Sequence, residues 1–222
     1  MRGLSRLETS RSFFVEAAKG VGELLAMTVK LDQYLKATDV VDWHQPSVIA
    51  LARTLAPDGS DPVAIARRCF EWVRDEIRHS WDYSLNPVTC SASEVLEHGT
   101  GLCYAKSHLL AALLRASGIP AGFCYQRLSR DEPGEPYCLH GLNAVYLPAY
   151  GWYLVDARGN KPGVDAQFAP PVPGLAFEIR FTGEYDLSGI LADPRPDVVA
   201  ALRRFDDIND VWAHLPDGAS GE

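Results

Sequence analysis

The stretch Gly99-Thr100-Gly101-Leu102-Cys103-Tyr104-Ala105-Lys106 places a cysteine directly behind a glycine-rich turn, at the predicted start of a helix. The first N–H groups of a helix have no partner within it, and they carry partial positive charge. That field favours a thiolate over a thiol. Cys103 is therefore a candidate nucleophile, and the same N–H groups are candidates to hold the oxyanion that its attack would form.

The helix that starts at Cys103 is predicted to end near Gly118, which stands where a left-handed cap belongs. Its apolar face is formed by Leu109, Leu110, Leu113 and Leu114. Two helices are predicted before it. Pro46 opens the first, and the second begins at Asp61, a good N-cap with Pro62 at the first helical position.

The segments around these helices are predicted to be less regular. Residues 29–43 are expected to include an extended segment, and residues 79–90 to form a loop that Asn86-Pro87 interrupts. Ser91-Ala92-Ser93-Glu94 fits a capping box before a short helix.

The second half of the chain favours strands. Residues 121–128, 137–147 and 152–156 are predicted as consecutive strands, because apolar and β-branched runs alternate with turn residues. A last strand is expected at 176–181 and a helix at 196–205. Helices first and an antiparallel sheet second indicate an α+β fold.

At 222 residues the chain is long enough for one domain with a full core. We expect this domain to cover residues 29–215, with an N-terminal extension at 1–28 and a frayed tail at 216–222. The formal net charge of -8 argues against nucleic acid as a partner, which needs a basic face.

The sequence also indicates a compartment. Every apolar stretch is shorter than the roughly 18 residues of a membrane helix, so no membrane contact is expected. Five cysteines, an odd number, without a signal peptide favour a reducing cytoplasm over a disulfide framework.

Two later residues are suited to assist Cys103. His140 is a candidate base, and Asp156 is a candidate to orient its imidazole. Strand alternation places His140, Leu142 and Ala144 on one face of their strand. If that face covers the helix that starts at Cys103, the three functional groups converge.

Several motifs resemble the transglutaminase-like superfamily over roughly residues 61–156. They are Gly101-Leu102-Cys103 opening a helix, the run from Ala111 to Ala121, a histidine opening a strand that ends Val145-Tyr146-Leu147-Pro148, and Gly151-Trp152-Tyr153-Leu154-Val155-Asp156. The preceding helix resembles that family too, through residues 70–77 and 80–82. The resemblance implies a papain-like core with Cys103 as nucleophile, His140 as base and Asp156 as orienting acid.

The sequence departs from the family pattern after His140 and after Asp156. Gly141-Leu142-Asn143 stands where members commonly have Ala-Trp and an acidic residue, and Ala157-Arg158 stands where Pro-Thr is usual. Residues 157–168 are similar to a motif of a bacterial subgroup of small, single-domain members. The chemistry therefore carries over better than the substrate.

The expected function is a thiol hydrolase or acyltransferase that acts on a peptide, protein or small amide through a thioester. Hydrolysis is favoured over cross-linking, since the sequence has no acidic calcium loop of EF-hand type. The alternative is a non-catalytic binding or scaffold protein on the same fold. Zinc held by Cys103, His140 and Asp156 is disfavoured because no close ligand pair accompanies them, and no cofactor is expected.

Four residues are candidates to bind the substrate: Trp81, Tyr83, Tyr104 and Arg158. For Trp81 and Tyr83 the rival interpretation, packing against the helix that starts at Cys103, is favoured. Arg158 either binds a substrate carboxylate or pairs with Asp165.

Overall fold

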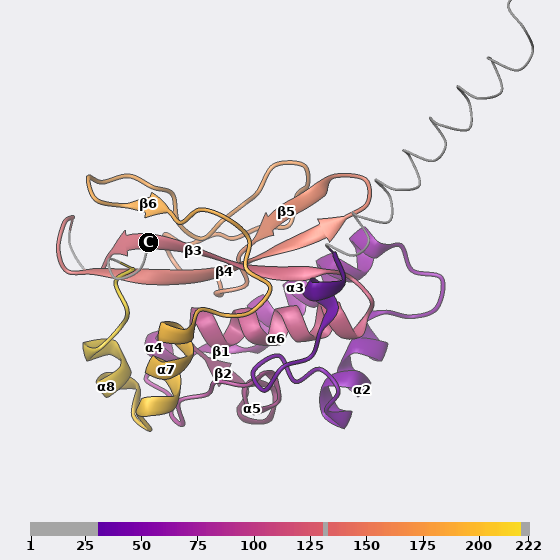
Figure 1. Ribbon diagram of the computed structural model, residues 1–222, viewed down its shortest axis with the longest axis horizontal. Coiled ribbons are helices and arrows are strands. Elements are labelled where there is room, and N and C mark those ends of the chain that lie inside the picture. Colours follow the sequence, from indigo (N-terminus) through magenta and orange to yellow (C-terminus); the bar gives the residue numbers. More distant parts are fainter. Residues whose placement is uncertain (1–30, 131–132, 219–222) are drawn as a thin grey trace, which may run out of the picture.

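The computed structural model describes residues 31–130 and 133–218. A four-stranded antiparallel sheet forms one layer, in the order β5-β4-β3-β6. Helices cover one of its faces, and α7 and α8 lie at one end (Figure 1). The strands are β3 (Ala121–Ser129), β4 (Tyr137–Leu147), β5 (Gly151–Val155) and β6 (Tyr185–Asp186). This arrangement confirms the predicted α+β architecture.

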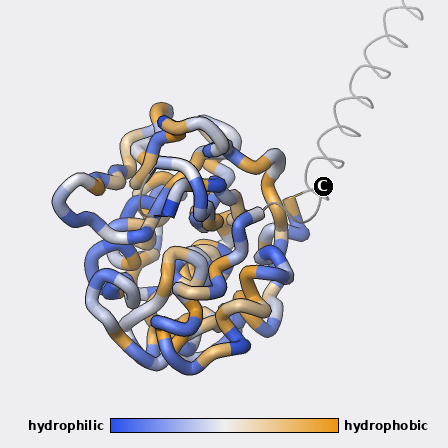
Figure 2. The backbone as a smooth tube through the Cα atoms, turned by 90° about the vertical axis from the view of Figure 1, so that its left-hand side faces the viewer, coloured by the Kyte–Doolittle hydropathy of each residue, from blue (hydrophilic) through white to orange (hydrophobic). Residues whose placement is uncertain are grey.

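Helix α6 (Cys103–Ala116) lies at the centre of the core, between the sheet and the other helices. Every residue from Cys103 to Arg115 is buried, so α6 has no solvent face, unlike the one-sided helix expected from its leucines. Around it lie α2 (Pro46–Leu55), α3 (Pro62–Glu76) and α5 (Ala92–His98). The backbone is coloured in short apolar and polar segments, as expected of elements with one buried face (Figure 2).

Local sequence signals explain where these helices begin. Asp61 caps α3 by accepting a hydrogen bond from the Ala64 N–H, and Pro62 occupies the first turn. Ser91 and Glu94 form the predicted capping box of α5. Gly118 adopts a left-handed conformation, with a φ of 74°, just after α6.

Three predicted segments were wrong. Residues 79–90 are not a plain loop: His79 belongs to β1 (Arg78–His79), which pairs in parallel with β2 (Thr100–Gly101), and α4 (Ser80–Tyr83) follows. The described part of 29–43 is helical at 31–35, including the 3-10 helix η1 (Gln33–Leu35), and contains no strand. Residues 176–181 form no strand.

The backbone of 176–181 is held by carboxylates instead of a neighbouring strand. The Ala176 N–H donates to Asp156, and the N–H groups of Arg180 and Phe181 donate to Glu184. A strand needs a partner for its backbone, so alternation alone was a misleading signal here. The sheet instead gains β6, a short strand beside β3.

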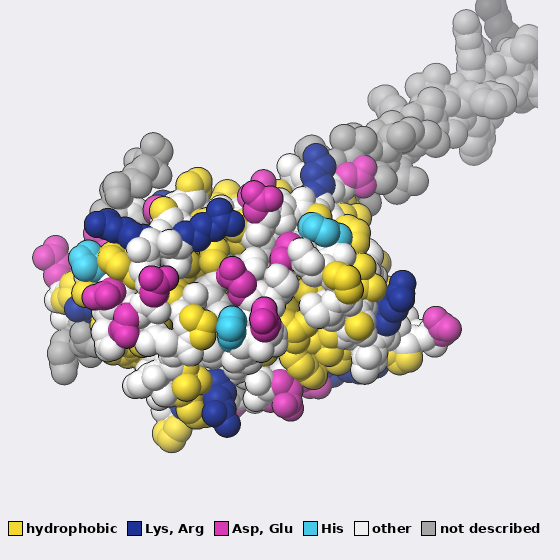
Figure 3. Space-filling view, turned by 90° about the horizontal axis from the view of Figure 1, so that it is seen from below, with side chains coloured by type: hydrophobic (Ala, Val, Ile, Leu, Met, Phe, Trp, Pro, Cys, Tyr) yellow, Lys and Arg dark blue, Asp and Glu magenta, His cyan; other side chains and the backbone are white. Residues whose placement is uncertain are grey.

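The C-terminal part holds the predicted helix α7 (Pro196–Arg204) and a further one, α8 (Ile208–Ala213). The expected frayed tail is not met at its start, because the Pro216 carbonyl accepts from the Leu139 N–H and the Asp217 carbonyl from Arg127. Residues 219–222 and the predicted extension 1–28 lie outside the described residues. Seen from the helical side, acidic, basic and apolar side chains lie in small separate groups (Figure 3).

Candidate active site

The start of α6 carries Cys103 and has no side-chain cap. Leu102 occupies the N-cap position and supplies no acceptor, so the first-turn N–H groups are not satisfied by it. Gly101 allows the preceding turn to approach closely, since a Cβ there would lie 3.1 Å from both the Ala105 Cβ and the Thr89 Oγ1. The pairing of β2 with β1 fixes this turn to the end of α3.

His140 and Asp156 form a buried pair. The His140 Nε2 and the Asp156 Oδ2 are 2.7 Å apart. Burial alone would lower the pKa of His140, but the Asp156 carboxylate and the neighbouring Cys103 raise it to about 10. Burial would raise the pKa of Asp156, yet His140 and the N–H groups of Ala176 and Arg158 lower it. The structure thus brings Cys103, His140 and Asp156 together.

The three groups converge by a route that differs from the expected one. Leu142 and Ala144, on the same strand face as His140, pack against Cys124, Trp152 and Leu154 in a second cluster. The face toward α6 is the other one, where the Asn143 amide donates to the Ser107 carbonyl. The condition set out above for convergence, that the His140 face covers α6, is therefore not met.

His140 reaches Cys103 because of its position along β4. β5 pairs with β4 only from Asn143 to Leu147, so His140 lies beyond the β5 pairing. Asp156 follows β5 directly and binds the ring there. The Phe177 ring packs against His140 edge-on, with centroids 5.0 Å apart, and this contact helps to fix the imidazole.

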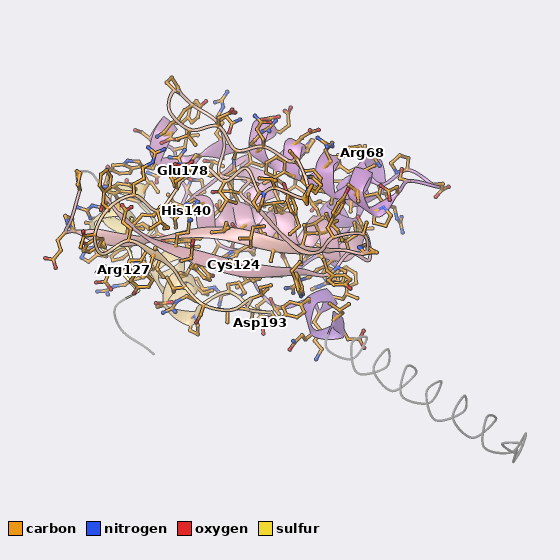
Figure 4. The ribbon with its side chains drawn as sticks, turned by 90° about the horizontal axis from the view of Figure 1, so that it is seen from above. Arg68, Cys124, Arg127, His140, Glu178 and Asp193 are labelled. Atoms are coloured by element: carbon orange, nitrogen blue, oxygen red, sulfur yellow. The ribbon has the colours of Figure 1, made fainter. Side chains whose placement is uncertain are left out.

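Cys103 and His140 open into a cavity of about 500 Å³. Phe177, Glu178 and Phe181 line one side of it, and Trp81 and Trp212 line another. The two tryptophan rings are stacked, 3.9 Å apart, and join α4 to α8. His140 and Glu178 both line this cavity, and both are labelled in Figure 4.

The four predicted binding residues have different positions. Trp81 and Arg158 line the cavity. Tyr104 also lines it but is almost wholly buried, and its hydroxyl donates to the Leu139 carbonyl. Tyr83 is 59% exposed under Arg78 and does not line the cavity, so its prediction was wrong. Arg158 pairs with Asp82 and not with Asp165.

Sequence reasoning missed several groups at this cavity. His79 was not among the candidates, yet it lines the cavity, and its Nδ1 has no hydrogen-bond partner. Burial and the nearby Arg158 lower the pKa of His79 well below its usual value, so it is neutral. Lys161 and Trp212 also line the cavity. Lys161 lies in the stretch 157–168, which was the one available signal for it.

The other buried cysteines differ from Cys103 in their surroundings. Burial raises the pKa of Cys69 to about 12, of Cys90 to about 11 and of Cys124 to about 12. Within 31–130 and 133–218, no group of three His, Cys, Asp or Glu side chains is placed to hold a metal ion. Over the same residues, no helix has the length and apolarity to cross a membrane.

The sequence matches the model of a known protein family. Residues 49–157 match the core model described as the transglutaminase-like superfamily. That range includes Cys103, His140 and Asp156 and ends before Arg158. No curated protein sequence matches the chain.

Solved structures with low identity also match. One is a protein from Cytophaga hutchinsonii whose name assigns it provisionally to the cysteine proteases. It is 19% identical, with a TM-score of 0.48, and the alignment covers 58% of this chain and 42% of that protein. Another is the periplasmic domain of TgpA from Pseudomonas aeruginosa, with 23% identity and a TM-score of 0.42, covering 56% and 45%. This chain therefore spans less than half the length of either of these two proteins.

Proposed function

The chain belongs to the transglutaminase-like superfamily, and on that premise we propose that it is a cysteine-dependent enzyme that hydrolyses amide bonds through a thioester on Cys103. One observation carries the proposal. Cys103 stands at the uncapped start of α6 beside His140, whose Nε2 is held by Asp156 at 2.7 Å. This is the arrangement that an activated thiol nucleophile requires.

The acylation step uses the two nitrogens of His140 differently. Nε2 is occupied by Asp156, so Nδ1 is left for Cys103 and the substrate. The Cys103 thiol proton passes to His140, the sulfur attacks the carbonyl carbon, and the C–N bond breaks. The imidazolium of His140 gives its proton to the leaving amine. The backbone N–H of Cys103 is a donor for the oxyanion.

The second step releases the acid. A water molecule attacks the thioester carbon, His140 takes a proton from it, and the C–S bond breaks to regenerate the sulfur nucleophile. An amine in place of water would give transfer instead of hydrolysis. Asp156 keeps its charge in both steps and orients the ring.

Thiol labelling tests the proposal. Iodoacetamide at about pH 6 should modify Cys103 first, because burial keeps Cys69, Cys90 and Cys124 as thiols. Peptide mapping by mass spectrometry identifies the site. His140→Ala should slow the modification of Cys103 at least about tenfold. Equal rates in the two proteins, or a rate no faster than that of a free thiol, would favour a non-catalytic scaffold.

The acyl acceptor needs a separate experiment. A panel of amide and glutamine-containing peptides is incubated with the protein, with and without a primary amine. Hydrolysis predicts free acid in both samples and a thioester on Cys103 in rapidly quenched intact-mass spectra. If more amine is incorporated than acid is formed, the proposed activity would be acyl transfer instead of hydrolysis.

A further inference from the structure

The stretch that follows Asp156 builds part of the cavity wall. The Arg158 guanidinium binds the Asp82 carboxylate with both terminal nitrogens, at 2.7 and 3.0 Å. The Lys161 Nζ binds the same carboxylate at 2.6 Å. We call these three residues, Asp82, Arg158 and Lys161, the Asp82 cluster. Its two cations line the cavity that holds Cys103, whereas Asp82 does not.

The loop is shaped to present these cations. Lys161 and Val164 exchange two backbone hydrogen bonds, which close a tight turn through Gly163, with a φ of 83°. The Asn160 side chain accepts from the Ala166 N–H at 2.8 Å and donates to Asp165 at 3.2 Å. The loop is thus held by its own polar side chains, and Lys161 stands at its turn.

The Asp82 cluster has an excess positive charge. Burial would raise the pKa of Asp82, but its bonds to Arg158 and Lys161 lower it to about 2, so one carboxylate faces two cations. Among the described residues, neither cation has a second carboxylate as an ion-pair partner. The neighbouring His79 is neutral. One positive charge is therefore uncompensated.

Two carboxylates, Glu178 and Glu184, also line the cavity, but its lining holds more cations than carboxylates, and both carboxylates bind other groups than the Asp82 cluster. Glu178 pairs with Arg180 at 3.2 Å. Glu184 accepts the N–H groups of Ser129, Arg180 and Phe181, which lower its pKa to about 2. Lys161 is 42% exposed and uses one of its three N–H donors on Asp82, so it retains donors for a ligand.

We propose that the Asp82 cluster is an anion subsite and that the substrate carries a carboxylate near its scissile bond. This inference rests on the proposed function and names its substrate class. Arg158 is fixed by Asp82 and contributes mainly charge, whereas Lys161 contacts the substrate carboxylate directly. The carboxylate is either an acidic side chain or the free end of a peptide. In a chain of net charge -8, this local field would select such a substrate against the general repulsion.

Two alkylating reagents of nearly equal size test the field at Cys103. Iodoacetate carries a carboxylate and iodoacetamide does not. The rate constant of iodoacetate divided by that of iodoacetamide therefore reports the electrostatic potential at the Cys103 sulfur. Lys161→Gln should lower this ratio about threefold to tenfold, and high salt should remove most of the difference. Lys161→Arg should retain the ratio. Arg53→Gln, at an exposed position of α2 outside the cavity, is the control for net charge.

Matched peptides then distinguish the two sources of the carboxylate. One pair differs by Glu or Gln beside the scissile bond, and the other by a C-terminal carboxylate or amide. The wild type should cleave the acidic peptide of one pair faster than its neutral counterpart, and Lys161→Gln should abolish this preference. The pair that shows it identifies whether the carboxylate is a side chain or the C-terminus. If iodoacetamide modifies Cys103 rapidly but Lys161→Gln leaves the ratio and both preferences unchanged, the subsite is refuted while the nucleophile stands. Slow modification by both reagents refutes the proposed function itself.

Discussion

Helices α5 and α6 follow each other in the chain, starting at Ala92 and Cys103, and their starts are capped in opposite ways. At α5, the Ser91 Oγ accepts from the Glu94 N–H, and Glu94 accepts from the N–H groups of Ser91 and Cys90, both at 2.9 Å. At α6, Leu102 offers no acceptor. One helix start is closed by its own side chains and the other is left open. The open one carries Cys103.

The difference shows where the chain gives up local stability. A cap contributes about 1 kcal/mol, which α6 forgoes at its first turn. Burial offsets this loss, because α6 is enclosed along nearly its whole length, and each fully buried leucine contributes about 1.5–3 kcal/mol. A helix in the centre of the core can therefore keep unsatisfied N–H groups that a short peripheral helix such as α5 has to satisfy.

The largest expected effect comes from removing the group at the open start. Cys103→Ser should reduce amide hydrolysis by about 10⁴-fold or more, because a hydroxyl beside His140 is a far weaker nucleophile. The midpoint of thermal unfolding should change little. Cys124→Ala, in the cluster on the other face of the sheet, is the control and should keep its activity. Substantial activity in Cys103→Ser would remove the distinction between the two helix starts.

The second prediction concerns the pair that serves the open start. Asp156→Asn removes the carboxylate that raises the pKa of His140 to about 10. The imidazolium would then lose its proton at a lower pH, so the alkaline limb of the pH profile of kcat/KM should move to lower pH. Activity near neutrality should fall about 10²-fold or more. An unmoved alkaline limb would show that Asp156 does not control the proton on His140.

The third prediction concerns the tie behind the open start. One turn after Cys103, the Lys106 Nζ donates to the carbonyls of Ile77 and Arg74, the latter at 3.3 Å, where α3 ends. Lys106→Met would leave these carbonyls without that partner and should lower the free energy of unfolding by about 1–3 kcal/mol. Chemical denaturation measures this loss, and a neutral effect would mean that the methionine packs as well as the bonded lysine.

The same variant gives a pH dependence of defined sign. Burial lowers the pKa of Lys106 from 10.5 to about 7 in the folded state. Between these values the unfolded chain binds more protons, so the stability of the wild type relative to Lys106→Met should fall as the pH drops from about 10 to 7. A difference that is constant over this range would show that Lys106 is not shifted.

The sequence predicted the long helices, the central strands and the three candidate side chains that the structure brings together, because caps, periodicity and motif residues are local signals. Its errors arose where a backbone or side chain binds a group that no local pattern specifies. Residues 176–181 alternate like a strand, but Asp156 and Glu184 bind their backbone. Likewise, the face of β4 that covers α6 depends on sheet packing, which alternation does not specify.

Substrate contacts were the hardest to predict for the same reason. One of the two alternatives for Arg158 was an ion pair with Asp165, seven residues away, whereas its partner is Asp82, 76 residues earlier. Lys161 became a candidate only once both cations were seen on that carboxylate. Tyr83 was a candidate to bind the substrate because it lies near the other candidates in the sequence, but its side chain is 59% exposed.

The smallest expected effect comes from the closed start. Ser91→Ala removes the acceptor for the Glu94 N–H and should lower the free energy of unfolding by about 1 kcal/mol, while kcat/KM stays unchanged. Ser91→Thr keeps the hydroxyl and should restore most of the stability. Chemical denaturation and activity assays on the same preparations provide both readouts. If Ser91→Ala reduced activity as well, α5 would be coupled to the position of Cys103, and its cap would serve the chemistry instead of stability alone.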